Sequence, residues 1–356
     1  MASTSGAQVL TLRSGEYSFS AELIEPGRYI NRRLRAPEVI QTVAGPGETV
    51  VELDLQVVPG SGRLWLPLRD SGGSGFVWSF DDDALRDGLG SPTSAIDPVG
   101  DDVSAVARAP DGALWLSGQG DVWRVDPTEL DEADPQVTSP FSYSGGWGWV
   151  SNLAFDPDGN LWTAEMAAGR VMMFTADQLD EGGSQSPQQT LDVPEVSGLA
   201  FDAHGNLWVS GADATNGTPY LIYRYDAADL AEPDPQPALT INARAVNLIT
   251  PVSDLAFDDA GDLWYTTGPS NPFVGHVPAE DASGSGTLSS DADQGVRLPH
   301  NAMAIGFDSR GDLWAIGYDG ELMVVQAADL VDGTSPTAST VDLDKTAYLG
   351  AFEIVD

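Results

Sequence analysis

Two polar residues occupy the same position of a repeated segment and have the chemistry of a metal site. Asn152 and Asp254 stand at the variable place of the pattern Val-Ser-x-Leu-Ala-Phe-Asp, and Glu165 follows the first of these segments. Amide and carboxylate oxygens are the ligands that Ca²⁺ and Mg²⁺ take in proteins. The three side chains therefore predict a divalent cation site if the fold brings them together. Because aspartate is abundant in this chain, carboxylates without a ligand are the alternative interpretation.

His300 and Glu165 are the candidates for a catalytic base. His300 lies in Leu298-Pro299-His300-Asn301, just ahead of a predicted strand, and an imidazole titrates near neutral pH. His300 and its neighbour Asn301 are also candidates for binding a ligand, whereas a structural role is the alternative. No serine lies in a recognisable nucleophile motif, so serine hydrolysis finds no support.

Two indoles lie in a glycine-rich segment, Gly145-Gly146-Trp147-Gly148-Trp149. The rings of Trp147 and Trp149 are suited to stack on a sugar or an aromatic ligand, because their flat faces favour such contacts. Packing of the indoles over the fold is the alternative interpretation. The predicted ligand-binding set consists of Trp147, Trp149, Asn152, His300 and Asn301.

The net charge of the chain restricts the classes of molecule that it can bind. The sequence has 54 acidic and 16 basic residues, a net charge of −38, and Lys345 is its single lysine. We expect no nucleic-acid partner, because phosphates need Lys and Arg to replace their counterions. The balance is typical of proteins from high-salt organisms, in which salt screens the repulsion between surface carboxylates.

The absence of cysteine removes disulfides, thiolate metal ligands and cysteine nucleophiles. No apolar run reaches the roughly 18 residues of a membrane-spanning helix, so we expect no membrane insertion. We expect the chain to be a soluble monomer.

A repeat predicts the architecture. The string Gly-x-Leu-Trp recurs six times with a period of about 50 residues, which admits four short strands and their turns. An apolar run that ends near Asp and Gly precedes five of the strings and indicates an inner strand followed by a tight turn. Four strands per unit, repeated six times, predict an all-β fold, a six-bladed β-propeller of four-stranded blades. The strings lie at residues 62–65, 112–115, 159–162, 205–208, 261–264 and 311–314.

The C-terminal strand is predicted to close the ring. Ala351-Phe352-Glu353 matches the end of the other inner strands, whereas no good match precedes the first Gly-x-Leu-Trp string. Residues 348–355 are therefore expected to form the inner strand of a blade that residues 62–98 complete. Closure removes the exposed strand edges that an open row of blades would leave. The propeller then spans residues 62–356.

Residues 1–61 stand outside the repeat as a small N-terminal β segment with a linker. Residues 15–21 and 50–57 alternate between apolar and polar side chains, which predicts two strands. The segment resembles the latter half of Ig-like domains of the carboxypeptidase-regulatory type, which often precede binding domains in secreted bacterial proteins. This resemblance favours an extracytoplasmic or secreted protein, and packing of the segment on the propeller is the alternative. The arginines of residues 31–35 are expected either to contact a partner or to lie in a solvated loop that is attracted to the acidic surface of the propeller.

The repeat also carries a resemblance to known families. The sequence LAFDPDGNLWTAEMAAGRVMMF, residues 153–174, resembles the units of NHL-type propellers and of streptogramin lyase, and more loosely those of the gluconolactonase family. The resemblance spans residues 62–355 and implies the propeller fold. Streptogramin lyase-like enzymes are implied to use His and Glu with a divalent cation in a central pocket, but no paired His and Glu motif carries over. Gluconolactonase-like proteins are implied to hold a metal with Glu, Asn and Asp, a set similar to Glu165, Asn152 and Asp254.

Strand direction places the candidate residues on one face. Consecutive strands of a blade run antiparallel, so loops that enter first strands and loops that join second to third strands share the face around the channel mouth. We expect a module that binds a protein, a glycan or a small-molecule ligand at this face. The alternative is a metal-dependent lyase or lactonase-type hydrolase with its site in the central channel.

Overall fold

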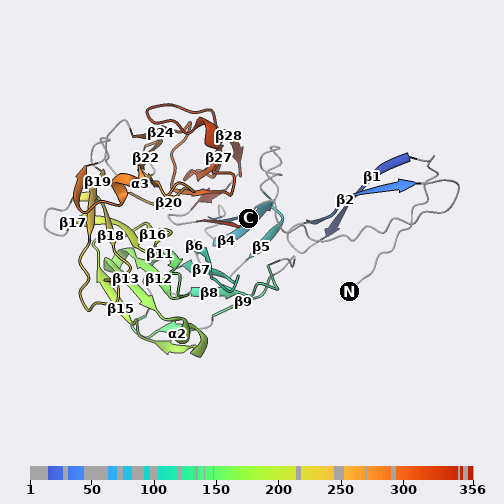
Figure 1. Ribbon diagram of the computed structural model, residues 1–356. Helices are drawn as coiled ribbons and strands as arrows, with labels where there is room; N and C mark the ends of the chain where they lie inside the picture. Colours follow the sequence, from blue (N-terminus) through green and yellow to red (C-terminus); the bar gives the residue numbers. More distant parts are fainter. Residues whose placement is uncertain are drawn as a thin grey trace.

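The computed structural model is an all-β protein whose blades surround a central channel, and it confirms the predicted six-bladed propeller (Figure 1). In the part of the chain that the structure describes, no helix has the length and apolar character needed to cross a membrane. The structure describes residues 15–26, 31–43, 63–69, 75–81, 92–96, 103–118, 122–130, 132, 135–139, 141–146, 148–213, 218–243, 252–268, 271–289, 294–343, 345–347 and 352–355.

The blades follow one another along the chain, and the first strands of neighbouring blades contact one another around the channel. Blade 2 contains β6 (Val103–Arg108), β7 (Leu114–Gly118), β8 (Val122–Val125) and β9 (Val137–Thr138). Blade 3 contains β11 (Val150–Phe155), β12 (Leu161–Glu165), β13 (Arg170–Phe174) and β15 (Gln189–Asp192). Blade 4 contains β16 (Leu199–Phe201), β17 (Leu207–Asp213), β18 (Thr218–Tyr225) and β19 (Leu239–Asn242). Blades 5 and 6 contain β20 (Leu255–Phe257), β21 (Leu263–Thr266), β22 (Phe273–Val277) and β24 (Gly295–Arg297), then β25 (Ala304–Phe307), β26 (Leu313–Ile316), β27 (Glu321–Val325) and β28 (Ser339–Asp342).

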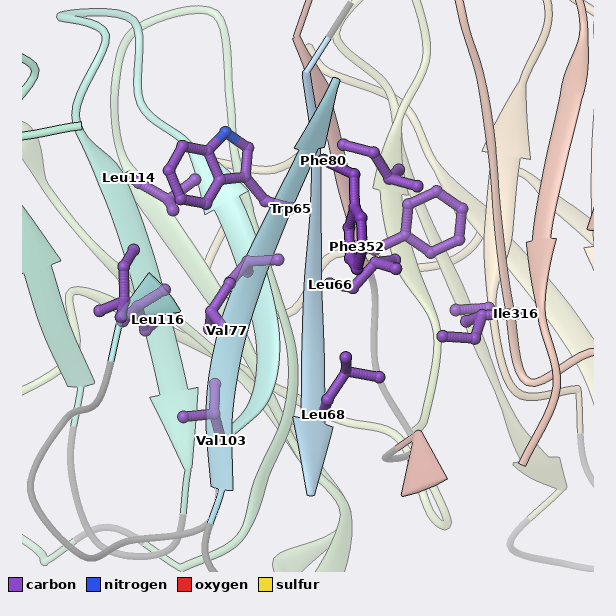
Figure 2. Packing of buried hydrophobic residues seen from close by; sticks show 14 of the residues in the cluster. Trp65, Leu66, Leu68, Val77, Phe80, Val103, Leu114, Leu116, Ile316 and Phe352 are labelled. Carbon is purple, nitrogen blue, oxygen red and sulfur yellow. The ribbon is translucent and has the colours of Figure 1, made fainter. Parts of the chain in front are cut away.

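The C-terminus completes blade 1, as predicted. The short strands β29 (Thr346–Ala347) and β30 (Glu353–Val355) both pair antiparallel with β3 (Arg63–Arg69). The blade continues through β4 (Gly75–Asp81) to β5 (Ser94–Ile96). Figure 2 shows Phe352 beside Leu66 and Phe80 in the core cluster that joins the first and last strands of the propeller. The two termini of the propeller therefore share one sheet and one core.

The repeated Phe-Asp-x-x-Gly-x-Leu-Trp segment folds as a turn that carries its own tryptophan. In blade 3, one oxygen of Asp156 accepts hydrogen bonds from the backbone N–H groups of Asp158 and Asn160. The other oxygen accepts the indole N–H of Trp162 at 3.0 Å. Gly159 has a φ of 82°, a left-handed conformation that glycine adopts without strain. The same aspartate-to-indole bond recurs as Asp202 with Trp208, Asp258 with Trp264 and Asp308 with Trp314.

Short helical turns follow several third strands, among them α2 (Ala176–Glu181) and α3 (Ala279–Ala282). The variable residue of Gly-x-Leu-Trp caps them from the neighbouring turn. The Asn160 side chain accepts the backbone N–H of Ala176, and the Asp262 side chain accepts that of Ala279. One repeat position therefore orders two turns at once.

Buried hydroxyl groups join one blade to the next. Ser104 donates to the carbonyl of Val150, and Ser197 donates to the carbonyl of Ser253 at 3.3 Å. Ser210 in β17 likewise donates to the carbonyl of Val252. Ser104, Ser151 and Ser197, which follow valine at the start of three repeats, thus bond across blade interfaces. The sequence analysis did not assign this role.

Loops that follow third strands also reach back to the preceding blade. The loop strand β14 (Gly183–Gln185) of blade 3 pairs parallel with β10 (Phe141–Tyr143), which follows β9. The loop strand β23 (Gly286–Ser289) of blade 5 pairs parallel with β19 of blade 4. In blade 6, Thr334 makes a parallel bridge to Val296 in β24. β23 thereby becomes a fifth strand of the blade 4 sheet, whereas β10 and β14 form a separate two-stranded sheet.

The N-terminal segment is an antiparallel ribbon of β1 (Gly15–Pro26) and β2 (Asn31–Val43) (Figure 1). The first expected strand, residues 15–21, lies in β1. The arginines expected in a loop instead lie in β2, where Arg32 is opposite Glu25 and Arg35 is opposite Glu22. Residues 50–57, the other expected strand, are outside the described residues.

Candidate functional site

Asn152 and Asp254 meet across the central channel. Asn152 lies in β11 of blade 3 and Asp254 lies directly ahead of β20 of blade 5, yet the Asn152 amide donates a hydrogen bond to the Asp254 carboxylate at 3.3 Å. Blade 4 separates these two blades, so the contact crosses the space that the first strands enclose. The two residues are 0% and 1% exposed. The pair therefore fills this part of the channel and excludes solvent from it.

A glycine in blade 4 makes room for the pair. Gly198 holds the repeat position that Asn152 and Asp254 hold in blades 3 and 5. A Cβ atom there would lie 3.0 Å from the Cα atom of Asp254 and 3.1 Å from the hydroxyl of Ser210. A side chain at position 198 would therefore push Asp254 away from Asn152.

Burial dominates the electrostatics of Asp254. Its second oxygen accepts the backbone N–H of Ile305 in β25 at 3.0 Å, which links the pair to blade 6. Loss of solvent raises the pKa of Asp254 to about 7, although hydrogen bonds from Ile305, Leu255 and Asn152 oppose the rise. Among the described residues, the Asn152 Oδ1 atom is buried without a hydrogen-bond partner. The channel thus contains the carboxyl group of Asp254, whose protonated form is favoured, and the amide oxygen of Asn152, which accepts no hydrogen bond within the described residues.

Glu165 has partners of its own. Both Nε and a terminal nitrogen of Arg170 contact its Oε2 atom, at 2.6 and 2.5 Å. The backbone N–H of Gly148 donates to its Oε1 atom at 2.8 Å. Arg170 also lies over the ring of Tyr143, 5.3 Å from its centroid. Glu165 is therefore a buried carboxylate whose charge Arg170 balances, and it orders the loop ahead of β11.

The predicted cation site can be tested against these contacts. Both Asp254 oxygens accept hydrogen bonds, and Arg170 balances the charge of Glu165. No group of three or more His, Asp and Glu side chains within the described ranges is arranged to hold a metal ion. Of the oxygen atoms of these three side chains, only Asn152 Oδ1 accepts no hydrogen bond within the described residues. The carboxylates of Glu165 and Asp254 would have to give up or share their present donors to hold a Ca²⁺ or Mg²⁺ ion.

Blade 6 carries two exposed candidates on the channel-mouth face, His300 and Tyr318. We call His300, Asn301, Tyr318 and Glu321 the blade-6 rim. The His300 side chain is 45% exposed, and its Nδ1 atom lies 3.6 Å from the Glu321 carboxylate. Tyr318 is 54% exposed, and it belongs to the tight turn between β26 and β27. His300 thus lies near Glu321 at the start of β27, and Tyr318 belongs to the turn just before that strand.

The two predicted tryptophans are placed differently. Trp149 lies half-buried just ahead of β11, next to the glycine that binds Glu165. Trp147 lies outside the described residues. Stacking of a ligand on these indoles stays a prediction.

Sequence reasoning missed Arg170 as the partner of Glu165. The signal is present, since a tight hairpin joins β12 to β13 and places Arg170 opposite Glu165 in the register. Opposite charges that face each other across a hairpin pair readily.

Comparisons with known proteins concern the fold. No protein-family model and no curated protein sequence matches this chain. A protein of unknown function from Bacteroides caccae is similar in structure, with a TM-score of 0.52, 11% identity, and coverage of 83% of this chain and 99% of that chain. A streptogramin B lyase has a TM-score of 0.45 at 12% identity, over 81% and 85% of the two chains. The PQQ-bound aldose sugar dehydrogenase from Streptomyces coelicolor has a TM-score of 0.48 at 17% identity, over 67% and 80%.

Proposed function

We propose that this chain is a binding module that receives a protein, a glycan or a small-molecule ligand on its channel-mouth face. The contact between Asn152 and Asp254 carries this proposal, because it fills the channel between blades 3 and 5 with buried side chains. Beside blades 3 to 5, a ligand that approaches this face therefore meets a filled channel. The fold supports a propeller module, and propellers host many unrelated functions.

The blade-6 rim is the part of this face that we propose for contact. The exposed phenol of Tyr318 offers a flat apolar surface, and the neighbouring pair of His300 and Glu321 in the same blade offers a donor and an acceptor. Tyrosine is enriched where proteins bind partners, because its ring buries a large area at a low cost in conformational entropy. Trp149 and Trp147 are the further candidates for stacking on a ligand.

The test is a screen of glycans and small molecules by thermal shift and tryptophan fluorescence on the intact chain. Each hit is then measured on Tyr318→Ala and on His300→Ala. The matched control is Val331→Ala, since Val331 is also 54% exposed but lies in the loop that follows β27. We expect the rim variants to weaken binding at least tenfold and the control to leave it unchanged. Hits that bind all three variants equally would overturn the assignment of the rim.

A second candidate function is a lyase or lactonase-type hydrolase in the central channel. The observation that favours it is the raised pKa of Asp254, because strongly shifted carboxyl groups cluster at catalytic sites. The contacts of Glu165 and Asp254 count against a metal in the present arrangement. A cation would have to displace Arg170 or Asn152 from these carboxylates.

Metal binding separates the two candidates. The melting temperature of the chain should be measured with Ca²⁺ or Mg²⁺ and after chelation. A rise with the ion that Glu165→Gln combined with Asp254→Asn abolishes would support the enzyme. No response of the unaltered chain to either ion would leave the binding module as the function.

A further inference from the structure

A cleft of about 460 Å³ lies between blades 3 and 4, on the flank of the propeller. One wall is formed by β15 and the residues that follow it, and the other by the third strand of blade 4 and the loop after it. We call it the inter-blade cleft. Its lining residues are Thr190, Leu191, Asp192, Val193, Pro194, Ala212, Tyr223, Tyr225, Pro233, Asp234, Pro235, Gln236 and Pro237.

The cleft occupies a place that a strand fills elsewhere in the ring. In blade 5 the loop strand β23 pairs in parallel with β19, the fourth strand of blade 4. In blade 6 Thr334 makes a parallel bridge to Val296 in the fourth strand of blade 5. In blade 3 the loop strand β14 pairs with β10, which follows the fourth strand of blade 2. The corresponding loop of blade 4 contains Pro233, Pro235 and Pro237, which have no N–H group for a sheet ladder. Among the described residues no strand pairs with the outer side of β15, which is the edge of its four-stranded sheet. An open strand edge is a template for another extended segment.

The charges of the cleft select a cation. Asp192 and Asp234 are exposed at its walls, and neither side chain makes an ion pair or hydrogen bond within the described part of the chain. None of the lining residues is Arg, Lys or His. The four prolines further reduce the backbone N–H donors, so acceptors predominate. A ligand with several N–H donors and a positive charge matches this wall.

Tyr225 lines the cleft and adds a second polar group that makes no hydrogen bond within the described residues. Tyr225 is 6% exposed, and its hydroxyl makes no hydrogen bond among the described residues. Burial raises the pKa of Tyr225 to about 12, and Tyr223 and Asp234 contribute to the rise, so the phenol is neutral. The hydroxyl of Tyr223 already donates to the carbonyl of Ala212 at 3.2 Å. The Tyr225 hydroxyl is therefore available to a ligand in the cleft.

We propose that the inter-blade cleft binds an extended peptide segment that carries an arginine or lysine and pairs in parallel with β15. The basic side chain lies against Asp192 and Asp234, and the peptide backbone takes the place beside β15 that β23 takes beside β19. The cleft shares no residue with the blade-6 rim, so this inference is independent of the proposed function and can fail separately.

The experiment measures two probes by calorimetry on the full chain at constant ionic strength. The peptide probe is acetyl-Thr-Arg-Leu-Arg-Thr-amide, and agmatine supplies a guanidinium and an ammonium without a peptide backbone. We expect saturable binding of one peptide per chain, at least tenfold tighter than agmatine, because backbone pairing adds to the charge interaction. Hydrogen exchange at the amides of residues 189–192 should slow at least tenfold in the complex. Equal or tighter binding of agmatine, or no protection of these amides, would overturn pairing with β15.

Variants separate the cleft from general attraction to an acidic surface. Asp192→Asn combined with Asp234→Asn should weaken the peptide at least tenfold, and Tyr225→Phe should weaken it several-fold. The matched control is Asp180→Asn combined with Asp281→Asn, which removes the same charge from exposed positions of blades 3 and 5. Because all four aspartates are exposed, we expect each double variant to fold, and circular dichroism checks this. Equal losses in the cleft and control variants, or no saturable binding by the unaltered chain, would overturn the proposal.

Discussion

The imidazole of His276 lies parallel to the indole of Trp264, with ring centroids 4.4 Å apart and planes inclined by 18°. One ring nitrogen contacts Asp262 at 3.1 Å, and the other contacts Asp332 in the loop of blade 6 at 2.9 Å. His276 therefore connects the repeat turn of blade 5 to the following blade, and it stacks on the repeat tryptophan at the same time.

His276→Ala should lower the melting temperature, because it removes the stacked ring and leaves Asp262 and Asp332 without their shared partner. Thermal denaturation followed by circular dichroism measures the effect. His204→Ala is the matched control, since His204 is exposed in the equivalent turn of blade 4. Equal melting of the two variants would show that the contacts of His276 do not stabilise the interface.

Trp208→Ala should destabilise the chain by roughly 3 to 5 kcal/mol, as truncation of a large buried aromatic does. Trp208 is 1% exposed, and its indole N–H bonds to Asp202 at 2.9 Å. Denaturant unfolding gives the change in free energy. Trp149→Ala, at a half-buried position outside the repeat turn, is expected to cost less, and the reverse order would contradict the alignment of the repeats.

Phe352→Ala tests the closure of the ring. Phe352 packs in the core cluster with Leu66 and Ile316, so its loss should loosen β30 from β3 and lower the cooperativity of melting (Figure 2). Removal of residues 346–356 should cost more still and promote aggregation, because it exposes the edge of β3. A truncated chain that melts like the intact protein would place the closure elsewhere.

The pH dependence of stability should carry the signature of Asp254. Its pKa is about 7 in the folded chain and near 3.8 when unfolded, so between these values the folded state holds a proton that the unfolded state releases. The contribution of Asp254 to the free energy of unfolding therefore falls as the pH rises from about 4 to about 7, by about 1.4 kcal/mol per unit of pKa shift.

Asp254→Asn should flatten that part of the profile, as measured by urea unfolding at several pH values. Asp202→Asn is a control with the opposite pH dependence, because the pKa of Asp202 is lowered and not raised. Hydrogen bonds from Trp208 and Asn206 outweigh desolvation and lower the pKa of Asp202, so its stabilisation is lost as the pH falls through the folded pKa. A profile of Asp254→Asn that parallels the unaltered chain between pH 4 and 7 would contradict the raised pKa.

Potassium chloride should raise the melting temperature between millimolar and molar concentrations. The chain has a net charge of −38, and its repulsion is screened over about 10 Å at 0.1 M and about 3 Å at 1 M. Chloride is preferable to sulfate, because sulfate also strengthens hydrophobic burial. An unchanged melting temperature would show that the carboxylates are too widely spread to repel one another.

The sequence by itself determined the propeller and its closure. Six copies of Gly-x-Leu-Trp encode one local unit each, because the aspartate, the left-handed glycine and the tryptophan of a repeat contact one another within a few residues. Phe352 predicted the closing strand for the same reason, since it belongs to that local pattern. The register also predicts that His300 and Asn301 lie on the channel-mouth face, and their role in binding stays a prediction.

Only the tertiary structure decided what the polar candidates contact. Asn152 and Asp254 are 102 residues apart, and their meeting depends on the absence of a side chain at Gly198 in the blade between them. The sequence predicts Glu165 as a ligand of a cation in the channel. In the structure, its carboxylate instead contacts Arg170 and accepts the N–H of Gly148. Repeat register determines the face of a residue, whereas its partners depend on the packing of three blades around one channel. The residues of a single repeat do not determine contacts between side chains of different blades.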